Sequence, residues 1–261
     1  MLKNEWTIPD NAILYEDEAI LVIEKPYALP SQPTLDPLRD NAYYAVERFL
    51  SKRSTSPVYV GLHHRLDALT SGVLLLSKSK DANPSLARQF QNHTIQKSYV
   101  AICNFLPHID KNYQTPNTSW IIDAPIGELP GKIQKFGVEG KKRKAAKTRV
   151  TCQQIVELRD VFLGVYRCEP ITGRTHQIRV HLSHLGLPIV EDPLYGTKSR
   201  ALTSILPGRM CLHAESITFL HPLTQSPMTI SAPLPQAFQK FLQKARALES
   251  HWKNAKNEKS L

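Results

Sequence analysis

The chain has 261 residues, of which 41% are hydrophobic and 21% are charged, which is enough apolar material for one large domain or two closely packed lobes. No apolar run approaches the roughly 18 residues that would suggest a membrane-spanning helix. Lys and Arg number 33 against 23 Asp and Glu, and the net charge of +10 predicts attraction to polyanions, nucleic acid first and an anionic membrane surface second.

The cysteines and the start of the chain indicate the compartment. The four cysteines are far apart in the sequence and form no Cys-x-x-Cys pair, and no signal peptide opens the chain. We therefore expect reduced thiols in a soluble cytoplasmic protein.

The first third of the chain predicts strands, a loop, a helix and another strand. An apolar run on each side of an acidic turn predicts a strand pair, which Lys25-Pro26 ends, and the prolines that follow exclude regular structure. Helical spacing comes next, and then an apolar run typical of a buried strand. The expected ranges are 13–15 and 19–23 for the strand pair, 27–37 for the loop, 41–52 for the helix and 73–76 for the strand.

The remainder is richer in strands than in helices. We expect a helix over 81–92 with Asp81 as its cap, and an amphipathic helix over 235–249 followed by a frayed tail from His251. Phe238, Phe241, Leu242, Ala245 and Leu248 would face inward on the second helix. Strands are expected at 95–103, 121–127, 149–158, 161–168, 210–214, 217–220 and 228–231, with a loop over 107–119 and a hairpin turn at 159–160. Strands and helices do not alternate strictly, which favours an α+β fold with a largely antiparallel mixed sheet.

The segment 131–147 is strongly basic. It lacks apolar periodicity and contains three glycines, so we expect a mobile loop. Its cations are Lys132, Lys135, Lys141, Lys142, Arg143, Lys144 and Lys147. A solvated run of charge and a surface for phosphate groups are both compatible with this pattern.

A charged tetrad, His64-Arg65-Leu66-Asp67, stands just before the buried strand and is followed by Thr70-Ser71-Gly72. Side chains at the mouth of a strand are held rigidly, which suits a reacting group. An ordinary turn or cap aspartate is the alternative for Asp67. An aspartate is ionised at neutral pH, and a guanidinium neighbour would keep it so when water is excluded.

The second dense motif runs from Ile171 to Gly186. Thr175 is the expected cap of a helix that Gly186 ends, with Ile178, Leu182 and Leu185 on one face and His176, Arg179 and Ser183 on another. The histidines at 176, 181 and 184 do not share one helix face, and no His-Glu-x-x-His occurs, so we expect no metal site. Phosphate-binding, dinucleotide-binding and serine-hydrolase motifs are also missing, and we expect no cofactor.

A carboxylate beside arginines on a basic chain suggests chemistry on a nucleic acid. An ionised Asp can act as a general base or as a nucleophile. A base or sugar within a nucleic acid must leave the stack to be reached, and an aromatic ring can hold the extruded base.

In these motifs the chain resembles the RluA-type RNA pseudouridine synthases over about residues 13 to 238. The resemblance rests on the tetrad with Thr70-Ser71-Gly72, on the Lys-x-Tyr-x-Ala pattern at 97–101, and on Gly173-Arg174-Thr175-His176-Gln177-Ile178-Arg179. Lys25-Pro26, Tyr195-Gly196, Leu212-His213-Ala214 and His221-Pro222 follow the order found in that family. The family usually has Gly at the position of Ala28, and Gly-Asp where Glu191-Asp192 stands.

The resemblance implies an isomerase that converts uridine in structured RNA, ribosomal or transfer, to pseudouridine without a metal or nucleotide cofactor. Asp67 would be the nucleophile, Tyr99 would stack on the flipped base and Arg179 would pair with Asp67. Arg65 would enter the space that the base leaves, and His64 would position its neighbours. The expected RNA-binding residues are His64, Arg65, Arg174, His176, Lys141, Lys142, Arg143 and Lys144.

The resemblance also implies a pseudouridine synthase-like fold, with helices flanking the sheet and a central RNA-binding cleft. One catalytic domain is expected over 13–249, with tails at 1–12 and 250–261 and no S4 domain. We expect a monomer. The alternatives are a catalytically inactive RNA-binding protein of the same fold and a metal-dependent nuclease.

Overall fold

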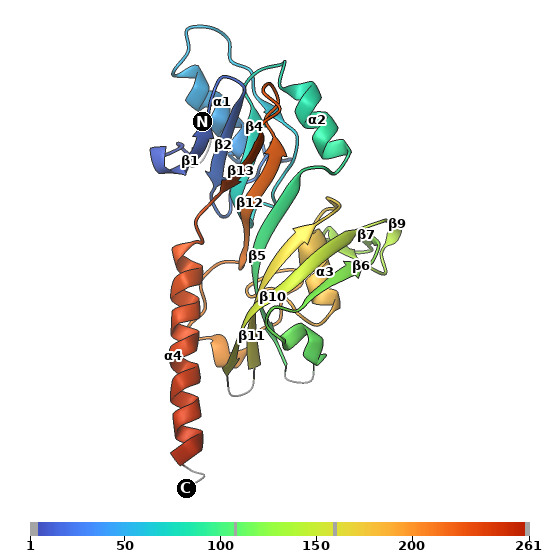
Figure 1. The fold of residues 1–261 in the computed structure, drawn as a ribbon, viewed down its shortest axis with the longest axis vertical. Helices are drawn as coiled ribbons and strands as arrows, with labels where there is room; N and C mark the ends of the chain where they lie inside the picture. Colours follow the sequence, from blue (N-terminus) through green and yellow to red (C-terminus); the bar gives the residue numbers. More distant parts are fainter. Residues whose placement is uncertain (1–4, 107–108, 159–160, 259–261) are drawn as a thin grey trace. The chain divides into compact units, whose positions relative to one another are not determined.

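The computed structural model describes residues 5–106, 109–158 and 161–258 (Figure 1). The chain divides into two compact units, residues 1–98 with 214–233 (unit 1) and residues 99–213 with 234–261 (unit 2). Composition does not mark this division, because two strands, β5 (Gln96–Phe105) and β12 (Leu212–Leu220), each continue from one unit into the other without a linker.

Unit 1 combines antiparallel strands with two helices. The strands β1, β2 and β4 lie in this order, β3 pairs with β4, and β13 pairs with β12. All seven residues of β4 are buried, as the continuous apolar run predicts. The bounds are β1 (Ile13–Glu16), β2 (Ile20–Lys25), α1 (Ala42–Ser51), β3 (Gly61–Leu62), β4 (Ser71–Ser77), α2 (Asn83–Gln91) and β13 (Pro227–Ser231), with a 3-10 turn η1 (Asp10–Ala12) before β1.

The two helices of unit 1 begin in different ways. Asn41 caps α1, because its side chain accepts the amide N–H of Tyr44. The predicted cap of α2, Asp81, is wrong: Ala82 precedes this helix, and no side chain caps it. Pro84 occupies its first turn, where a residue without an N–H leaves no donor unpaired.

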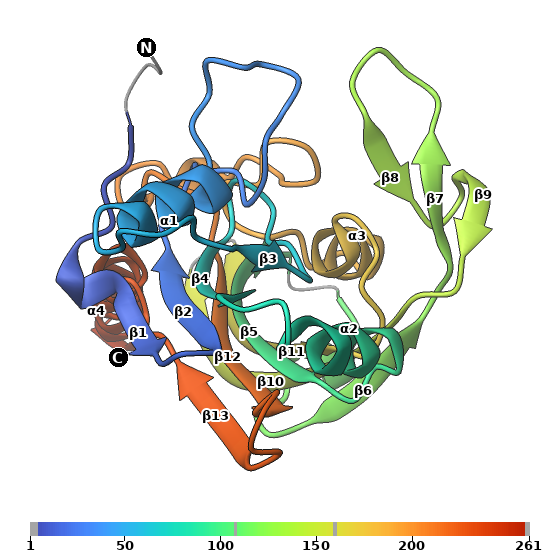
Figure 2. The same cartoon turned by 90° about the horizontal axis from the view of Figure 1, so that it is seen from above.

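Unit 2 contains a four-stranded antiparallel sheet in the order β5-β11-β10-β6, and a three-stranded sheet in the order β8-β7-β9 (Figure 2). The bounds are β6 (Ser119–Asp123), β7 (Ile126–Leu129), β8 (Lys135–Gly137), β9 (Lys141–Lys144), β10 (Lys147–Leu158) and β11 (Val161–Pro170), with α3 (Gln177–His184), α4 (Gln236–Glu258) and the 3-10 turns η2 (Lys111–Gln114) and η3 (Arg200–Leu202). The predicted turn at 159–160 and residues 107–108 of the predicted loop lie outside the described residues. The α+β prediction with a largely antiparallel sheet is confirmed.

The basic segment is a sheet, and its prediction as a mobile loop is wrong. We call residues 126–144, which form β7, β8 and β9, the basic sheet. Backbone contact holds it together: a Cβ on Gly127 would lie 2.2 Å from the carbonyl oxygen of Lys141, and one on Gly140 would lie 2.1 Å from that of Gly127. Its charged side chains face solvent, so the sequence lacks the apolar alternation by which a strand is recognised.

The last helix is longer than predicted, because α4 continues through His251 to Glu258. Four of the five residues expected to face inward are buried, whereas Leu248 is 40% exposed. Glu249 supports the added turns: its carboxylate accepts the amide of Glu157 and pairs with Lys253 one turn later. Among the described residues, no helix combines the length and the apolar character that crossing a bilayer would require.

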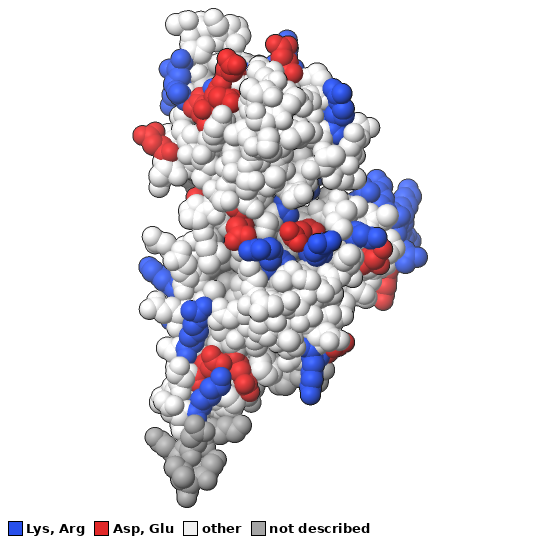
Figure 3. Space-filling view, viewed as in Figure 1, with Lys and Arg blue, Asp and Glu red and all other residues white. Residues whose placement is uncertain are grey.

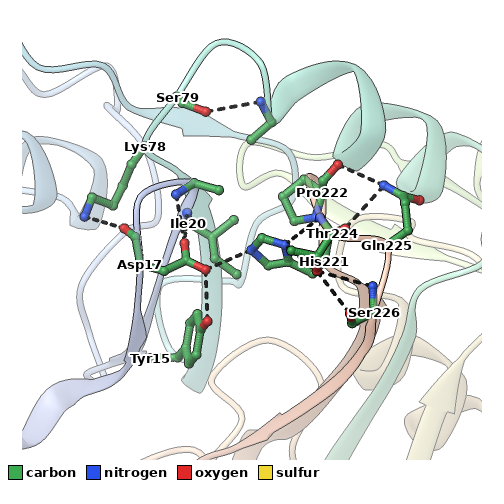
Figure 4. A network of polar contacts seen from close by, with 12 residues as sticks. Tyr15, Asp17, Ile20, Lys78, Ser79, His221, Pro222, Thr224, Gln225 and Ser226 are labelled. Atoms are coloured by element: carbon green, nitrogen blue, oxygen red, sulfur yellow. Dashed lines mark hydrogen bonds and ion pairs between the residues drawn. The ribbon is translucent and has the colours of Figure 1, made fainter.

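A network of polar contacts joins the β1–β2 turn to the β12–β13 turn in unit 1 (Figure 4). Asp17 Oδ1 accepts the amides of Ala19 and Ile20, both at 2.8 Å. Asp17 Oδ2 accepts the Tyr15 hydroxyl at 2.9 Å and lies 2.8 Å from His221 Nε2. Burial alone would raise the pKa of Asp17, but these hydrogen bonds outweigh it and hold the pKa below its ordinary value.

We predict that Asp17→Asn lowers the free energy of unfolding at pH 7 by about 1–3 kcal/mol, because the variant weakens several hydrogen bonds to a charged group. A lowered folded-state pKa adds stability above the unfolded pKa of about 3.9, and this stability is lost as the pH falls through the folded value. Urea unfolding between pH 3 and 7 should therefore show the difference shrinking below about pH 4. Asp10→Asn, at an exposed position, is the control; a difference that is constant with pH would contradict the prediction.

Candidate active site

Asp67 lies on a turn whose backbone is fixed on its N-terminal side by Ser31. The Ser31 hydroxyl accepts the amide of Leu66 at 2.9 Å and donates to the carbonyl of the same residue at 2.8 Å. Both residues are buried. The amide of Thr70 donates to the carbonyl of Asp67 at 3.0 Å and closes the turn. The residue that precedes the candidate nucleophile is therefore held through both of its backbone polar atoms.

Lys25 fixes the same turn on its other side. It is fully buried at the end of β2, and its ammonium donates to the carbonyls of Pro26, Leu29 and Ala68 at 2.9, 2.7 and 3.2 Å. Ala68 directly follows Asp67, so this lysine ties the end of β2 to the candidate nucleophile's own turn. In the sequence, Lys25-Pro26 marks only the end of a strand and a family motif. The signal that could have found this role is a lysine that ends an apolar, buried strand. A lysine buried there needs hydrogen-bond partners.

His64 has the geometry of a positioning residue. Its Nε2 accepts the amide of Leu75 in β4 at 3.0 Å, and its ring stacks on Phe90 with centroids 4.9 Å apart. Burial, followed by the charges of Lys97 and His63, lowers the pKa of His64 to about 3. The ring is therefore neutral at physiological pH, which favours a positioning role over a proton shuttle.

Gly72 meets a strict spatial requirement at the start of β4. Its φ is +113°, and a Cβ there would lie 2.1 Å from the carbonyl oxygen of Ala214 in β12. Only glycine combines this φ with that close approach. The glycine of the motif Thr70-Ser71-Gly72 thus has a structural role: it lets the segment after Asp67 pack against β12.

In unit 2, Arg179 forms a buried bidentate ion pair with Asp192. Arg179 Nε lies 2.7 Å from Asp192 Oδ2 and Nη2 lies 2.9 Å from Oδ1, and both side chains are at most 3% exposed. Asp192 Oδ1 also accepts the amides of Leu194 and Tyr195. Burial would raise the pKa of Asp192, but the bonds from Arg179 and the two amides outweigh it and lower the pKa. In the sequence, Asp192 is noticed only as the neighbour of the departure at Glu191, and its partnership with Arg179 was not predicted.

The other residues of the second motif have mostly internal partners. The predicted cap Thr175 is wrong: His176 precedes α3, with a left-handed φ of 56°. His176 Nδ1 lies 3.0 Å from the Tyr195 hydroxyl, and Arg174 Nε donates to the carbonyl of Ala145 at 3.0 Å. Gly186 has a φ of 75°, as a glycine just after a helix should.

Tyr99 belongs to β5 and lies opposite Cys168 of β11. It is 8% exposed. Of the predicted site residues, unit 1 therefore holds His64, Arg65 and Asp67, and unit 2 holds Tyr99, Arg174, His176, Arg179 and the cations of the basic sheet. Arg65 is exposed and Asp67 is half-buried.

The cations Lys141, Lys142, Arg143 and Lys144 form β9, and all four are exposed. Figure 3 shows Lys and Arg side chains gathered over this part of the molecule. Lys142 adopts a φ of 50° where the pairing of β7 with β9 is irregular. Arg143 Nη1 donates to the carbonyl of Val138 at 3.2 Å. The result is a dense positive surface carried by an edge strand of the basic sheet. Among the residues that the structure describes, no cluster of His, Cys, Asp and Glu could hold a metal ion.

The two departures from the family pattern share a backbone feature. Ala28 has a φ of 67° and Glu191 a φ of 56°, so both occupy the left-handed region that glycine adopts without strain. Glu191 gains a compensating contact, because its carboxylate accepts the amide of Arg209 at 2.8 Å. The glycines expected at these positions thus have a conformational explanation.

These features define a class of protein: an α+β protein with a carboxylate on a fixed turn, a buried arginine–carboxylate pair and a basic sheet suited to a polyanion. The chain belongs to the RNA pseudouridylate synthase family, whose model matches residues 19–184. It is thus an RNA pseudouridine synthase, an isomerase that acts on uridines in RNA.

Individual relatives agree with this assignment. The chain is 37% identical over 242 residues to ribosomal large subunit pseudouridine synthase C of Escherichia coli, covering 90% of this chain and 70% of the relative. It is 35% identical over 232 residues to the uncharacterized RNA pseudouridine synthase YjbO of Bacillus subtilis, covering 88% and 75%. Human RNA pseudouridylate synthase domain containing 1 has a similar structure, with a TM-score of 0.64, 26% identity and coverage of 90% and 94%.

We predict that Ala28→Gly stabilises the protein. A residue with a Cβ in the left-handed region costs about 1–2 kcal/mol, and the added freedom of glycine in the unfolded chain returns about 0.4–1 kcal/mol of this. The free energy of unfolding should rise by roughly 0.5–1 kcal/mol, measured by urea denaturation. Ala82→Gly is the control, because Ala82 has a φ of −70° and should lose stability. A destabilised Ala28→Gly would refute the strain at this position.

Proposed function

We propose that this enzyme converts uridines of ribosomal RNA to pseudouridine with Asp67 as its nucleophile. The observation that carries the proposal is the fixed turn around Asp67, whose flanking residues are bound by Ser31 and Lys25. A nucleophile on a preorganised backbone reacts without first losing conformational freedom. The choice of ribosomal over transfer RNA is supported by the E. coli relative, which is named for the large ribosomal subunit.

In the proposed reaction, the Asp67 carboxylate attacks either the anomeric carbon of the sugar or the uracil ring. The bond between the sugar and N1 of uracil breaks, the base turns within the site, and carbon 5 bonds to the anomeric carbon. On the first path carbon 5 displaces the carboxylate from the anomeric carbon as this bond forms, and on the second the carboxylate is eliminated from the ring afterwards. The proton on carbon 5 then leaves to solvent. Substrate and product are isomers, so the balance needs no oxidant and no second substrate.

Tyr99 is proposed to stack on the flipped uracil and Arg179 to pair with Asp67, while Arg65 enters the space that the base leaves. Two observations support Arg179 in this role. Its guanidinium is buried, and Asp192 holds it in a bidentate geometry that leaves little rotational freedom. His64 is proposed to act through its contact with Leu75 rather than on RNA. We further infer that the enzyme works in the cytoplasm as a monomer.

RNA binding is assigned to the basic sheet. Each cation of β9 is exposed and can reach a phosphate, and the strand keeps the four charges at a fixed spacing. Arg174 and His176 have partners within unit 2. We therefore propose that they hold the basic sheet in place and do not themselves bind RNA.

Asp67→Ala should abolish the release of tritium from RNA labelled at carbon 5 of uridine, because no carboxylate remains to break the glycosidic bond. RNA binding, measured by filter retention, should persist. Asp81→Ala, an exposed aspartate of the same unit, is the control and should keep full activity. Tritium release that persists in Asp67→Ala would refute the nucleophile, and a wild-type enzyme that binds RNA without release would favour the inactive alternative.

Replacing Lys141, Lys142, Arg143 and Lys144 by Gln should weaken RNA binding and flatten its dependence on salt. The log–log slope should fall by about 0.7–0.9 for each phosphate that the protein no longer neutralises. The matched control removes the same charge from α4, by replacing Lys240, Lys244, Arg246 and Lys253 with Gln. An equal fall of the salt-dependence slope in both variants would show that RNA binding depends on the net charge of the protein and not on the cations of the basic sheet.

A further inference from the structure

The basic sheet touches the rest of unit 2 through a small apolar cluster. The buried members of this cluster are Ile126, Ala146, Val180 and Tyr195, and Phe136, Val138 and Leu194 pack against them. Phe136 and Val138 belong to β8 and the turn after it, and α3 contacts β8. The strand β9, by contrast, is exposed throughout. This cluster therefore contributes to the orientation of the basic sheet within unit 2.

The hydroxyl of Tyr195 is the polar centre of this cluster. It accepts the backbone amide of Phe136 in β8 at 2.9 Å and lies 3.0 Å from His176 Nδ1. Because the amide of Phe136 can only donate, the tyrosine proton is available for the imidazole nitrogen. The rings of Phe136 and His176 also meet edge to face, with centroids 5.7 Å apart. Two residues of unit 2 thus hold one strand of the basic sheet.

The same tyrosine touches the Arg179–Asp192 ion pair. Its amide donates to Asp192 Oδ1 at 3.1 Å, and the guanidinium of Arg179 lies 5.1 Å from the centre of its ring. The ammonium of Lys135 in β8 lies 5.3 Å from the same centre. Tyr195 therefore contacts the basic sheet through its hydroxyl and the ion pair through its ring and backbone.

We propose that Tyr195, with His176, is a positioning residue that fixes the basic sheet relative to Arg179, so that RNA held on the sheet is in register with the proposed catalytic arginine. This rests on the proposed function of the basic sheet and of Arg179. The left-handed backbone of His176 fits the assignment, because a strained conformation persists where surrounding contacts impose it. His176 then acts through Tyr195, and contact with RNA is not needed to explain its presence in the motif.

Two substitutions separate the contribution of the Tyr195 hydroxyl from that of its ring. Tyr195→Phe keeps the ring beside Arg179 and removes the acceptor of the Phe136 amide. We expect hydrogen exchange at the Phe136 amide of the free protein to accelerate about tenfold, and KM for RNA to rise by a similar factor, at an unchanged kcat. Tyr195→Leu also removes the ring and should lower kcat in addition.

Tyr166→Phe is the matched control. Tyr166 is a fully buried tyrosine of the same unit whose hydroxyl donates to the carbonyl of Tyr113 at 2.9 Å, and its loss should change neither the Phe136 exchange nor KM. Unchanged exchange or unchanged KM in Tyr195→Phe would overturn the proposal, as would equal effects in Tyr166→Phe. The exchange measurement needs no RNA, so it stands even if the wild-type enzyme proves inactive on the RNA tested.

Discussion

The buried ion pair between Arg179 and Asp192 is the interaction on which the rest of unit 2 depends. Breaking a buried pair by removing one partner costs about 3–5 kcal/mol, because the remaining charge has no compensation. Asp192 satisfies its oxygens with Arg179 and with the amides of Leu194 and Tyr195, so the pair also fixes the loop after α3. Tyr195 extends this support to β8 and hence to the basic sheet. One arginine thus links the helix that carries it, the loop that holds it and the surface proposed to bind RNA.

In unit 1, buried polar side chains fix the backbone around Asp67. Lys25 and Ser31 are buried polar residues whose bonds end on the residues that flank Asp67. Buried polar groups demand partners, and when those partners are backbone atoms the local chain has little freedom left. His64 adds a neutral ring bonded to β4. The charged residues of the tetrad are therefore presented by a turn whose shape is set before substrate arrives, which is the condition under which orientation contributes to rate.

Some of these features could be predicted from the residues alone, and others could not. The apolar run of β4 and the helical spacing of α1 gave correct elements, because burial leaves a periodic pattern. The basic sheet left no such pattern, since glycine-mediated backbone contacts hold strands whose side chains face water. The resemblance supplied the family and Asp67, but it gave no role to Asp192, because a partnership with a residue thirteen positions away depends on the fold. At Ala28 and Glu191 the comparison with the family was more informative than residue propensity. The absence of the usual glycine marked two positions whose backbone is left-handed.

The proposed role of Arg179 in catalysis requires that Asp192 orient its guanidinium. The most direct test is the single-turnover rate of uridine conversion in Asp192→Asn, measured with enzyme in excess over RNA. The amide keeps the shape of the carboxylate and removes its charge, and displacing a catalytic group by about 1 Å can cost roughly 10²-fold in rate. We predict a fall of that order at saturating enzyme, where weaker RNA binding does not enter the rate. A folded Asp192→Asn enzyme with the wild-type rate would contradict the claim.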